Sequence, residues 1–153
     1  MAIRIRKSEP ADLPALFEIW RTAVAATHDF VSSEDQAAIS RIVHVEYLPT
    51  AELDVAVDED DTPLAFLGMT DNVIDSLFVH ADSRHSGLGR LLAELALSRS
   101  RVIQTEVNEQ NSQAVGFWKH IGFRVVGRSD TDHKGKPYPL LIMERSSDTE
   151  GSP

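Results

Sequence analysis

The sequence predicts an α/β protein built on a mixed sheet of about seven strands, with helices on both faces. Short segments that alternate apolar and polar residues, as strands do, are separated by segments with apolar residues every three or four positions, as in helices. A chain of 153 residues, 42% of them hydrophobic, suits one domain with a single core. The unit strand–helix–strand over residues 73–107 requires a parallel pair, because a crossover helix returns the chain in the same direction.

The first third of the chain predicts one strand and two helices. Residues 2–6 alternate Ile with Arg and predict the strand. Ser8 is expected to cap the first helix, and Ser33 to start the second, which Pro49 closes. The apolar stripe of the first helix comprises Leu13, Leu16, Phe17, Trp20 and Val24. The inner face of the second comprises Ile39, Ile42, Val43 and Tyr47.

The middle of the chain predicts a meander of three strands over residues 52–79, because the turn-forming segments DEDDTP and TDN interrupt it. A helix is expected directly after Gly89, with an apolar side that comprises Leu88, Leu91, Leu92 and Leu95. Residues 101–107 predict the next strand. The parallel pair is therefore expected near the middle of the sheet.

The last part of the chain predicts a helix that Asn111 caps and Gly122 ends. Its inner face comprises Ala114, Val115, Trp118 and Ile121. Two final strands, 123–129 and 138–145, are joined by the polar loop DTDHKGKP. The predicted order is β-α-α-β-β-β-α-β-α-β-β.

Composition and charge exclude several classes of protein function. The net charge of −9 is the opposite of what a nucleic-acid binder needs, and it suits either a cationic partner or simple solubility. Cysteine is absent, which removes disulfides and cysteine nucleophiles, and six scattered histidines predict no metal site. Without a membrane-length apolar run or a signal-peptide pattern, we expect a cytoplasmic protein that is not bound to a membrane. We expect one domain over residues 1–145, a flexible tail over 146–153, and either a monomer or a homodimer.

The heptad RHSGLGR, residues 84–90, lies between a predicted strand and a predicted helix. Helix starts attract anions, because their N–H groups are unpaired and carry a partial positive charge. Gly87 and Gly89 let a ligand approach the backbone without meeting a Cβ, and Arg84 and Arg90 add positive charge. From the heptad alone, an anion site and a plain glycine turn both remain open.

Two common nucleotide motifs do not fit this heptad. A P-loop needs lysine followed by serine or threonine after its second glycine, whereas Arg90 and Leu91 follow Gly89. A dinucleotide fingerprint needs a third glycine where the chain has Leu92. The pattern that remains is [R/Q]-x-x-G-x-[G/A].

The segment EVNEQNSQAVGFWKHIGF, residues 106–123, resembles the V-x-x-x-N-x-x-A-x-x-[FL]-Y-x-x-x-G-F run of the GCN5-related N-acetyltransferases, the GNAT family. The matching residues are Val107, Asn111, Ala114, Phe117, Gly122 and Phe123. The heptad matches the phosphate-binding pattern of the same family, in the same order and at the same separation. The segments IWRTAVAATHDFVS and GKPYPLL further resemble a bacterial YjaB-type subgroup.

This resemblance implies acetyl-coenzyme A as the donor. Its pyrophosphate is expected on the heptad backbone, and its pantetheine arm in a wedge between the splayed parallel strands, at 77–79 and 105–108. A backbone N–H of 77–79 is expected to face the thioester carbonyl. Asn111 is expected to reach the arm as well as cap its helix, although capping alone is the alternative. The implied donor-binding residues are Leu77, Phe78, Val79, Arg84, His85, Ser86, Gly87, Leu88, Gly89, Arg90, Asn111 and Trp118.

The resemblance also implies direct acetyl transfer to a primary amine through a tetrahedral intermediate. An amine with a pKa near ~10.4 is almost wholly protonated at pH 7, so a base must take its proton. Asp75 and Glu106 stand where relatives carry a carboxylate base. For each of them, the alternative is a solvated or ion-paired strand carboxylate.

Position 118 departs from the family pattern. The family usually has a tyrosine there, which protonates the departing thiolate, whereas this chain has Trp118, whose indole gives up no proton near neutral pH. Tyr138 is a candidate substitute acid, and a core or strand-end tyrosine is the alternative. The departure also favours a second hypothesis, in which the protein is a non-catalytic acyl-coenzyme A sensor or regulatory module.

The acceptor-binding region is expected to come from the first two helices and the final hairpin, with His28, Asp29 and Phe30 in the connection between the two helices. His28 is a candidate for orienting the acceptor or relaying a proton, while Thr27 and Asp29 fit a simple turn equally well. Small-molecule amines, peptide N-termini and protein lysines all remain open as acceptors.

Overall fold

Within the described residues, 2–27 and 29–146, the computed structural model contains seven strands and four α-helices. The strands are β1 (Arg4–Lys7), β2 (Leu53–Val57), β3 (Pro63–Thr70), β4 (Val73–Val79), β5 (Val102–Asn108), β6 (Arg124–Ser129) and β7 (Leu140–Ser146). The helices are α1 (Leu13–Thr27), α2 (Ser33–Ile42), α3 (Leu88–Leu97) and α4 (Ser112–Ile121). The predicted order of elements is therefore confirmed.

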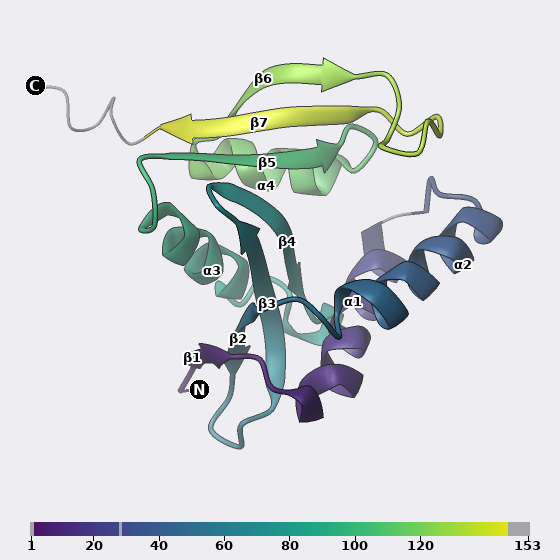
Figure 1. Cartoon of the computed structure of the whole chain (residues 1–153). Coiled ribbons are helices and arrows are strands. Elements are labelled where there is room, and N and C mark those ends of the chain that lie inside the picture. Colours follow the sequence, from purple (N-terminus) through teal and green to yellow (C-terminus); the bar gives the residue numbers. More distant parts are fainter. Residues whose placement is uncertain (1, 28, 147–153) are drawn as a thin grey trace, which may run out of the picture. The chain divides into compact units, whose positions relative to one another are not determined.

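Figure 1 labels these strands and helices along the chain. The strands form one mixed sheet in the order β1-β2-β3-β4-β5-β7-β6. Strands β4 and β5 pair in parallel, with Val73 opposite Gln104 and Ile74 opposite Thr105. The seven-stranded mixed sheet and its parallel pair are as the sequence predicts. The chain forms two compact units, one of Met1–Gly68 with Ser76–Ala93 and one of Met69–Asp75 with Glu94–Pro153.

The core of the first unit is built where α1 packs its apolar stripe against β2 and β3. Leu16 and Trp20 of the predicted stripe are buried there, together with Ile19. Strand β2 is buried along its whole length, which explains why its sequence, LDVAV, is nearly continuous in apolar residues.

The start of α1 differs from the prediction, because Ser8 does not cap it. The N–H of Ser8 donates to Leu53 O at 2.8 Å and its Oγ accepts from Leu53 N at 3.2 Å, so Ser8 extends the pairing of β1 with β2. A short 3-10 helix, Pro10–Asp12, precedes α1 instead, and Asp12 Oδ2 accepts from Glu9 N at 2.8 Å.

Helix α2 starts at Ser33, as predicted, and Ser32 is its cap: the Ser32 Oγ accepts from Asp35 N at 3.1 Å. The burial and the end of the helix differ from the prediction. Ile39 is 39% exposed rather than inward-facing. The helix continues as a π-helix over Val43–Tyr47, which the 3.6-residue period does not anticipate, and this widening lets Tyr47 reach Ser76, with 2.7 Å between their hydroxyl oxygens.

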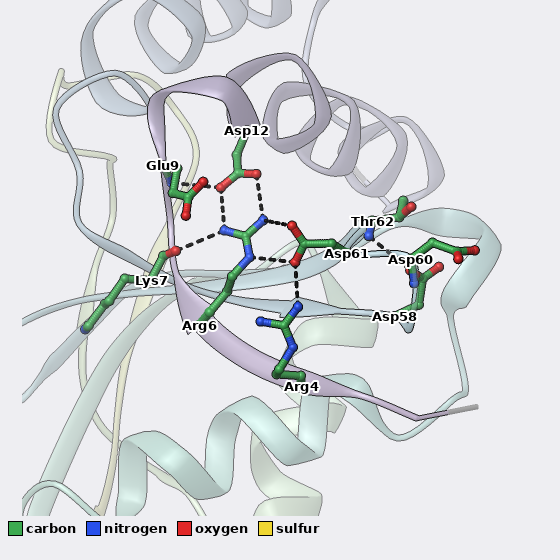
Figure 2. A network of polar contacts seen from close by, with 9 residues as sticks. All are labelled: Arg4, Arg6, Lys7, Glu9, Asp12, Asp58, Asp60, Asp61 and Thr62. Atoms are coloured by element: carbon green, nitrogen blue, oxygen red, sulfur yellow. Dashed lines mark hydrogen bonds and ion pairs between the residues drawn. The ribbon is translucent and has the colours of Figure 1, made fainter.

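A network of ion pairs centred on Arg6 fixes β1 to the start of α1 (Figure 2). The guanidinium donates to both carboxylate oxygens of Asp12, at 2.8 and 2.9 Å, and its Nε donates to Asp61 at 2.9 Å. Asp61 also accepts from Arg4 at 2.8 Å. The side chains of Arg6 and Asp12 are only 15% and 9% exposed, so this pair is shielded from water. The hydrogen bond from Arg6 lowers the pKa of Asp12, against the opposing effect of burial.

Replacing Asp12 with asparagine is expected to reduce the free energy of unfolding by about 2 kcal/mol at pH 7, because the shielded Arg6 loses a charged partner. A carboxyl group whose folded pKa is lowered stabilises the fold above its unfolded value, near ~3.9, and this contribution is lost as the pH falls through the folded value. Urea unfolding should therefore show a difference between the two proteins at pH 7 that shrinks below about pH 4. A difference that persists under acid would contradict the role assigned to the Asp12 charge.

The second unit contains the three strands β5, β7 and β6 and a helix along them. Strands β5 and β7 are antiparallel in unbroken register from Val102–Ser146 to Asn108–Leu140, and β6 pairs with the other edge of β7. Helix α4 lies along these strands (Figure 1). Its ends are as predicted: Asn111 caps it, and Gly122, at φ +107°, ends it in the left-handed conformation.

The predicted boundary at 146 is off by one residue, because Ser146 pairs with Val102 and ends β7. The rest of the expected tail, 147–153, lies outside the described residues. Helix α3 begins at Leu88, so Gly89 stands in its first turn rather than before it. Leu91 is 38% exposed, which corrects its predicted inward position, whereas Leu88 and Leu92 are buried. No helix within 2–27 and 29–146 is both long and apolar enough to cross a membrane.

Candidate functional site

The heptad at 84–90 forms a loop whose backbone enters the left-handed region twice before α3 begins. His85 has φ +63° and Gly87 has φ +87°. Conformations of this kind turn successive N–H groups toward one side, as in the concave anion sites of many phosphate-binding loops. The first hydrogen bond of the helix runs from Leu91 N to Gly87 O at 3.0 Å, so the N–H groups of Leu88 and Gly89 have no carbonyl one turn before them.

The backbone conformation at position 87 requires glycine, and the space beside this residue is open. A Cβ at this position would meet no atom of the chain within 4 Å, yet φ +87° strains any other residue. Leu88 is buried and anchors the first turn from below. Arg84 is half-buried and Arg90 exposed, and both bring positive charge to this turn. These features suit a diphosphate, because an open backbone, a helix start and two cations favour the same negatively charged group.

The strand end before this loop, Leu77–Val79, is half-buried. Phe78 packs against Phe66 of β3, with ring centroids 5.7 Å apart. The chain leaves β4 in register with β3, because His80 N donates to Leu64 O at 2.8 Å. Ala81 N then donates to Thr22 Oγ1 at 3.1 Å, and this hydrogen bond fixes the segment before the loop to α1.

The expected acceptor-binding segment connects α1 with α2 in the same unit. Asp29 is exposed and Phe30 half-buried. Val31 is 8% exposed and anchors the segment, and its carbonyl accepts from Gln36 Nε2 at 3.1 Å. His28 lies outside the described residues.

Asp75 belongs to the second unit and points to solvent, because alternation along β4 buries its neighbours Ile74 and Ser76. Its Oδ2 accepts a 2.5 Å hydrogen bond from Thr70 Oγ1. The carboxylate is thus accessible and oriented by a hydroxyl group.

Glu106, the other candidate base, is exposed on β5 and has a partner that the sequence did not indicate. His133 Nε2 lies 2.6 Å from Glu106 Oε1. This hydrogen bond raises the pKa of His133, since it favours the protonated imidazole. The two residues are 27 positions apart, so no local spacing connects them.

Asn111, Trp118 and Tyr138 are all buried in the second unit. The Asn111 side-chain oxygen accepts from Ala114 N at 3.1 Å, which is the predicted cap. Trp118 is 6% exposed and packs edge-on against Phe123, with ring centroids 4.9 Å apart. The indole thus belongs to an aromatic cluster of the core. Tyr138 is 8% exposed, and its N–H donates to Lys136 O at 2.7 Å.

Comparison with known proteins agrees with this architecture. The model of the acetyltransferase (GNAT) domain family matches residues 23–138. The chain is 47% identical over 143 residues to the peptidyl-lysine N-acetyltransferase YjaB of Salmonella typhimurium, which covers 94% of this chain and 98% of that protein.

Two solved structures are similar along nearly the whole chain. The solution structure of apo-form YjaB from Escherichia coli has a TM-score of 0.90 and 46% identity, covering 94% of this chain and 97% of that one. The PaiA N-acetyltransferase of Thermoplasma acidophilum, in complex with coenzyme A, has a TM-score of 0.75 and 25% identity, covering 95% of this chain and 99% of that one.

The fold, the loop at the start of α3 and the matching family model define the class: the chain belongs to the GNAT family of acetyltransferases. It is an N-acetyltransferase that uses acetyl-coenzyme A as its acetyl donor. The family and the element order expected from the sequence are thereby confirmed.

Proposed function

We propose that the acceptor is the ε-amino group of lysine in a peptide or protein. The observation that carries this proposal is the 47% identity, over 94% of the chain, to an enzyme named a peptidyl-lysine N-acetyltransferase. The net charge of −9 supports it, since a lysine side chain is cationic until it loses its proton. Asp29 and Phe30, with His28, are proposed to contact the acceptor.

The donor is proposed to bind along the segments that the sequence singled out in the first unit. Backbone N–H groups between His85 and Arg90 would hold the pyrophosphate, with Ser86 in the same loop and Arg84 adding charge. The backbone of Leu77–Val79 would pair with the pantetheine arm as an added strand does. The contact of Asn111 with the donor stays a prediction. When bound, acetyl-coenzyme A supplies an activated acetyl group as a thioester.

The acceptor amine must lose its proton before it can react, and we propose that Glu106 or Asp75 takes it. Both carboxylates lie on strands and are exposed, so each is open to a proton from solvent or from an amine. The partner of each differs: a hydroxyl group holds Asp75, while an imidazole faces Glu106. Direct transfer through a tetrahedral intermediate remains a prediction.

The acid that protonates the leaving thiolate is proposed to be Tyr138. Trp118, which stands where the family pattern has tyrosine, packs among Phe117 and Phe123 and donates no proton near neutral pH. A thiolate with a pKa near ~8.5 also leaves without such help more readily than an alkoxide. The alternative that Trp118 suggested from the sequence, a non-catalytic acyl-coenzyme A sensor, disagrees with the family to which the chain belongs.

The proposal includes further expectations about domain organisation, location and partners. The chain acts as one domain over residues 1–145, in the cytoplasm, as a monomer or a homodimer. It acts without nucleic acid, membrane or metal.

The proposed function is tested by incubating the protein with acetyl-coenzyme A and a peptide that has one lysine and an acetylated N-terminus. We expect free thiol release and acetylation of that lysine by mass spectrometry, and neither with the matched peptide in which arginine replaces lysine. Thiol release with small amines but not with the lysine peptide would contradict the proposed acceptor.

A further inference from the structure

The contact between Glu106 and His133 joins the middle of β5 to the loop that connects β6 with β7. With 2.6 Å between Nε2 and Oε1, it is a short hydrogen bond between an imidazole and a carboxylate. Because Nε2 faces the carboxylate, it keeps its proton and donates it in the hydrogen bond. The imidazole therefore gains or loses a proton at Nδ1.

The loop around His133 is built to hold it in place. The Asp132 carboxylate accepts from the backbone N–H groups of Lys134 and Lys136, both at 2.9 Å. Asp132 N also donates to Lys136 O at 3.1 Å, and Gly135 adopts φ +76° in the turn. His133 therefore stands directly after a residue that closes a tight turn.

A second interaction attaches this loop to the end of β5. Arg128, at the end of β6, donates to both carboxylate oxygens of Glu109, at 2.8 and 3.1 Å, and pairs with Asp130. Because Glu109 follows β5 directly, the strand that carries Glu106 and the loop that carries His133 are linked independently of the Glu106–His133 contact.

The fold does not need the Glu106–His133 pair for stability. The two side chains are 42% and 76% exposed, and pairs this exposed are typically worth only ~0–1 kcal/mol. The charged groups that act on the imidazole are Glu106 from β5 and Asp132 from the loop itself, and both raise the pKa of His133. The protonation state of His133 thus depends chiefly on the carboxylate it contacts.

We propose that His133 is a positioning residue for acetyl transfer, which holds the Glu106 carboxylate and governs how readily it takes the acceptor's proton. This inference rests on the proposed function, in which Glu106 is a candidate base. A protonated imidazole offsets the negative charge of the carboxylate, and a neutral one still donates from Nε2 but brings no positive charge. The proton leaves the acceptor nitrogen and arrives on a carboxylate oxygen of Glu106, so no oxidant or reductant is needed.

The test compares kcat/KM for one lysine peptide between the wild type and His133→Gln from pH 6 to 9. Glutamine keeps an N–H donor but carries no charge, and the ratio of the two rates cancels the titration of the peptide amine. We expect the ratio of kcat/KM in the variant to kcat/KM in the wild type to fall by roughly tenfold as the pH rises. At low pH the protonated imidazole makes Glu106 a weaker base in the wild type only, and this difference disappears once the imidazole is neutral. His120→Gln, at an exposed position of α4, should give a ratio that does not vary. A constant ratio for His133→Gln overturns the inference.

A second readout does not require turnover. NMR titration of the imidazole should give a pKa for His133 above its ordinary value of ~6.5, and Glu106→Gln should bring it down toward that value. An unchanged titration in Glu106→Gln overturns the inference. If the wild type acetylates lysine and the pH ratio is constant, only the inference fails; if it acetylates nothing, the proposed function fails and this role falls with it.

Discussion

Glu106→Gln is expected to lower kcat/KM for lysine-peptide acetylation by ~100- to 10,000-fold, the usual contribution of a general base. Glutamine has nearly the same shape as glutamate but takes up no proton. Because the side chain is exposed on β5, the change should leave folding intact, which a melting curve would verify. The measurement is steady-state kinetics at saturating acetyl-coenzyme A.

Two further variants test whether Glu106, and not another carboxylate, is the base. Asp75→Asn should produce a smaller loss, because Thr70 already holds one oxygen of that carboxylate while Glu106 contacts a group that exchanges protons. Glu52→Gln removes a charge at an exposed position outside the proposed site and should match the wild type. A greater loss in Asp75→Asn than in Glu106→Gln would transfer the role of base to Asp75.

Gly89→Glu is expected to weaken coenzyme A binding by at least ~100-fold. Gly89 is the second residue of α3, and a negative charge there would stand close to the proposed pyrophosphate. Two like charges ~5 Å apart repel by about 3 kcal/mol at an effective dielectric constant of 20. The same carboxylate interacts favourably with the helix dipole in a first turn, so the free energy of unfolding should not fall.

Calorimetry with coenzyme A gives the affinity, and thermal unfolding without ligand gives the stability. Gly116→Glu is the matched control, because Gly116 is exposed in α4 and an added Cβ would meet nothing within 4 Å. That variant should bind coenzyme A as the wild type does. Equal binding by Gly89→Glu would show that the start of α3 does not hold the diphosphate.

Elements whose signals are local were predicted well. Asn111 caps α4 and Gly122 ends it, because a cap and a left-handed glycine act within one helical turn of where they stand. The strands of the meander follow from alternation and turn residues. The start of α1 was less accurate, because Glu9 and Asp12 take the capping role that Ser8 was expected to have.

Burial was predicted less well than secondary structure. Ile39 and Leu91 fit the apolar periodicity of their helices but are exposed. Periodicity predicts which side of a helix is apolar, but it does not predict which residues of that side another element covers. The ion pairs of Arg6 were not foreseen, because Asp61 is 55 residues away in the sequence. The π-helix at Val43–Tyr47 was not predicted, because its backbone departs from the 3.6-residue period of an α-helix.

The sequence by itself determined the family, the order of elements and the glycine loop at the start of α3, because these depend on residues close together in the chain. Only the tertiary structure decided which partner each candidate base has, Thr70 for Asp75 and His133 for Glu106, and that the ring of Trp118 packs against Phe123. The physical reason is that hydrogen bonds and packing depend on distance in space, and folding brings together side chains whose separation along the chain carries no signal.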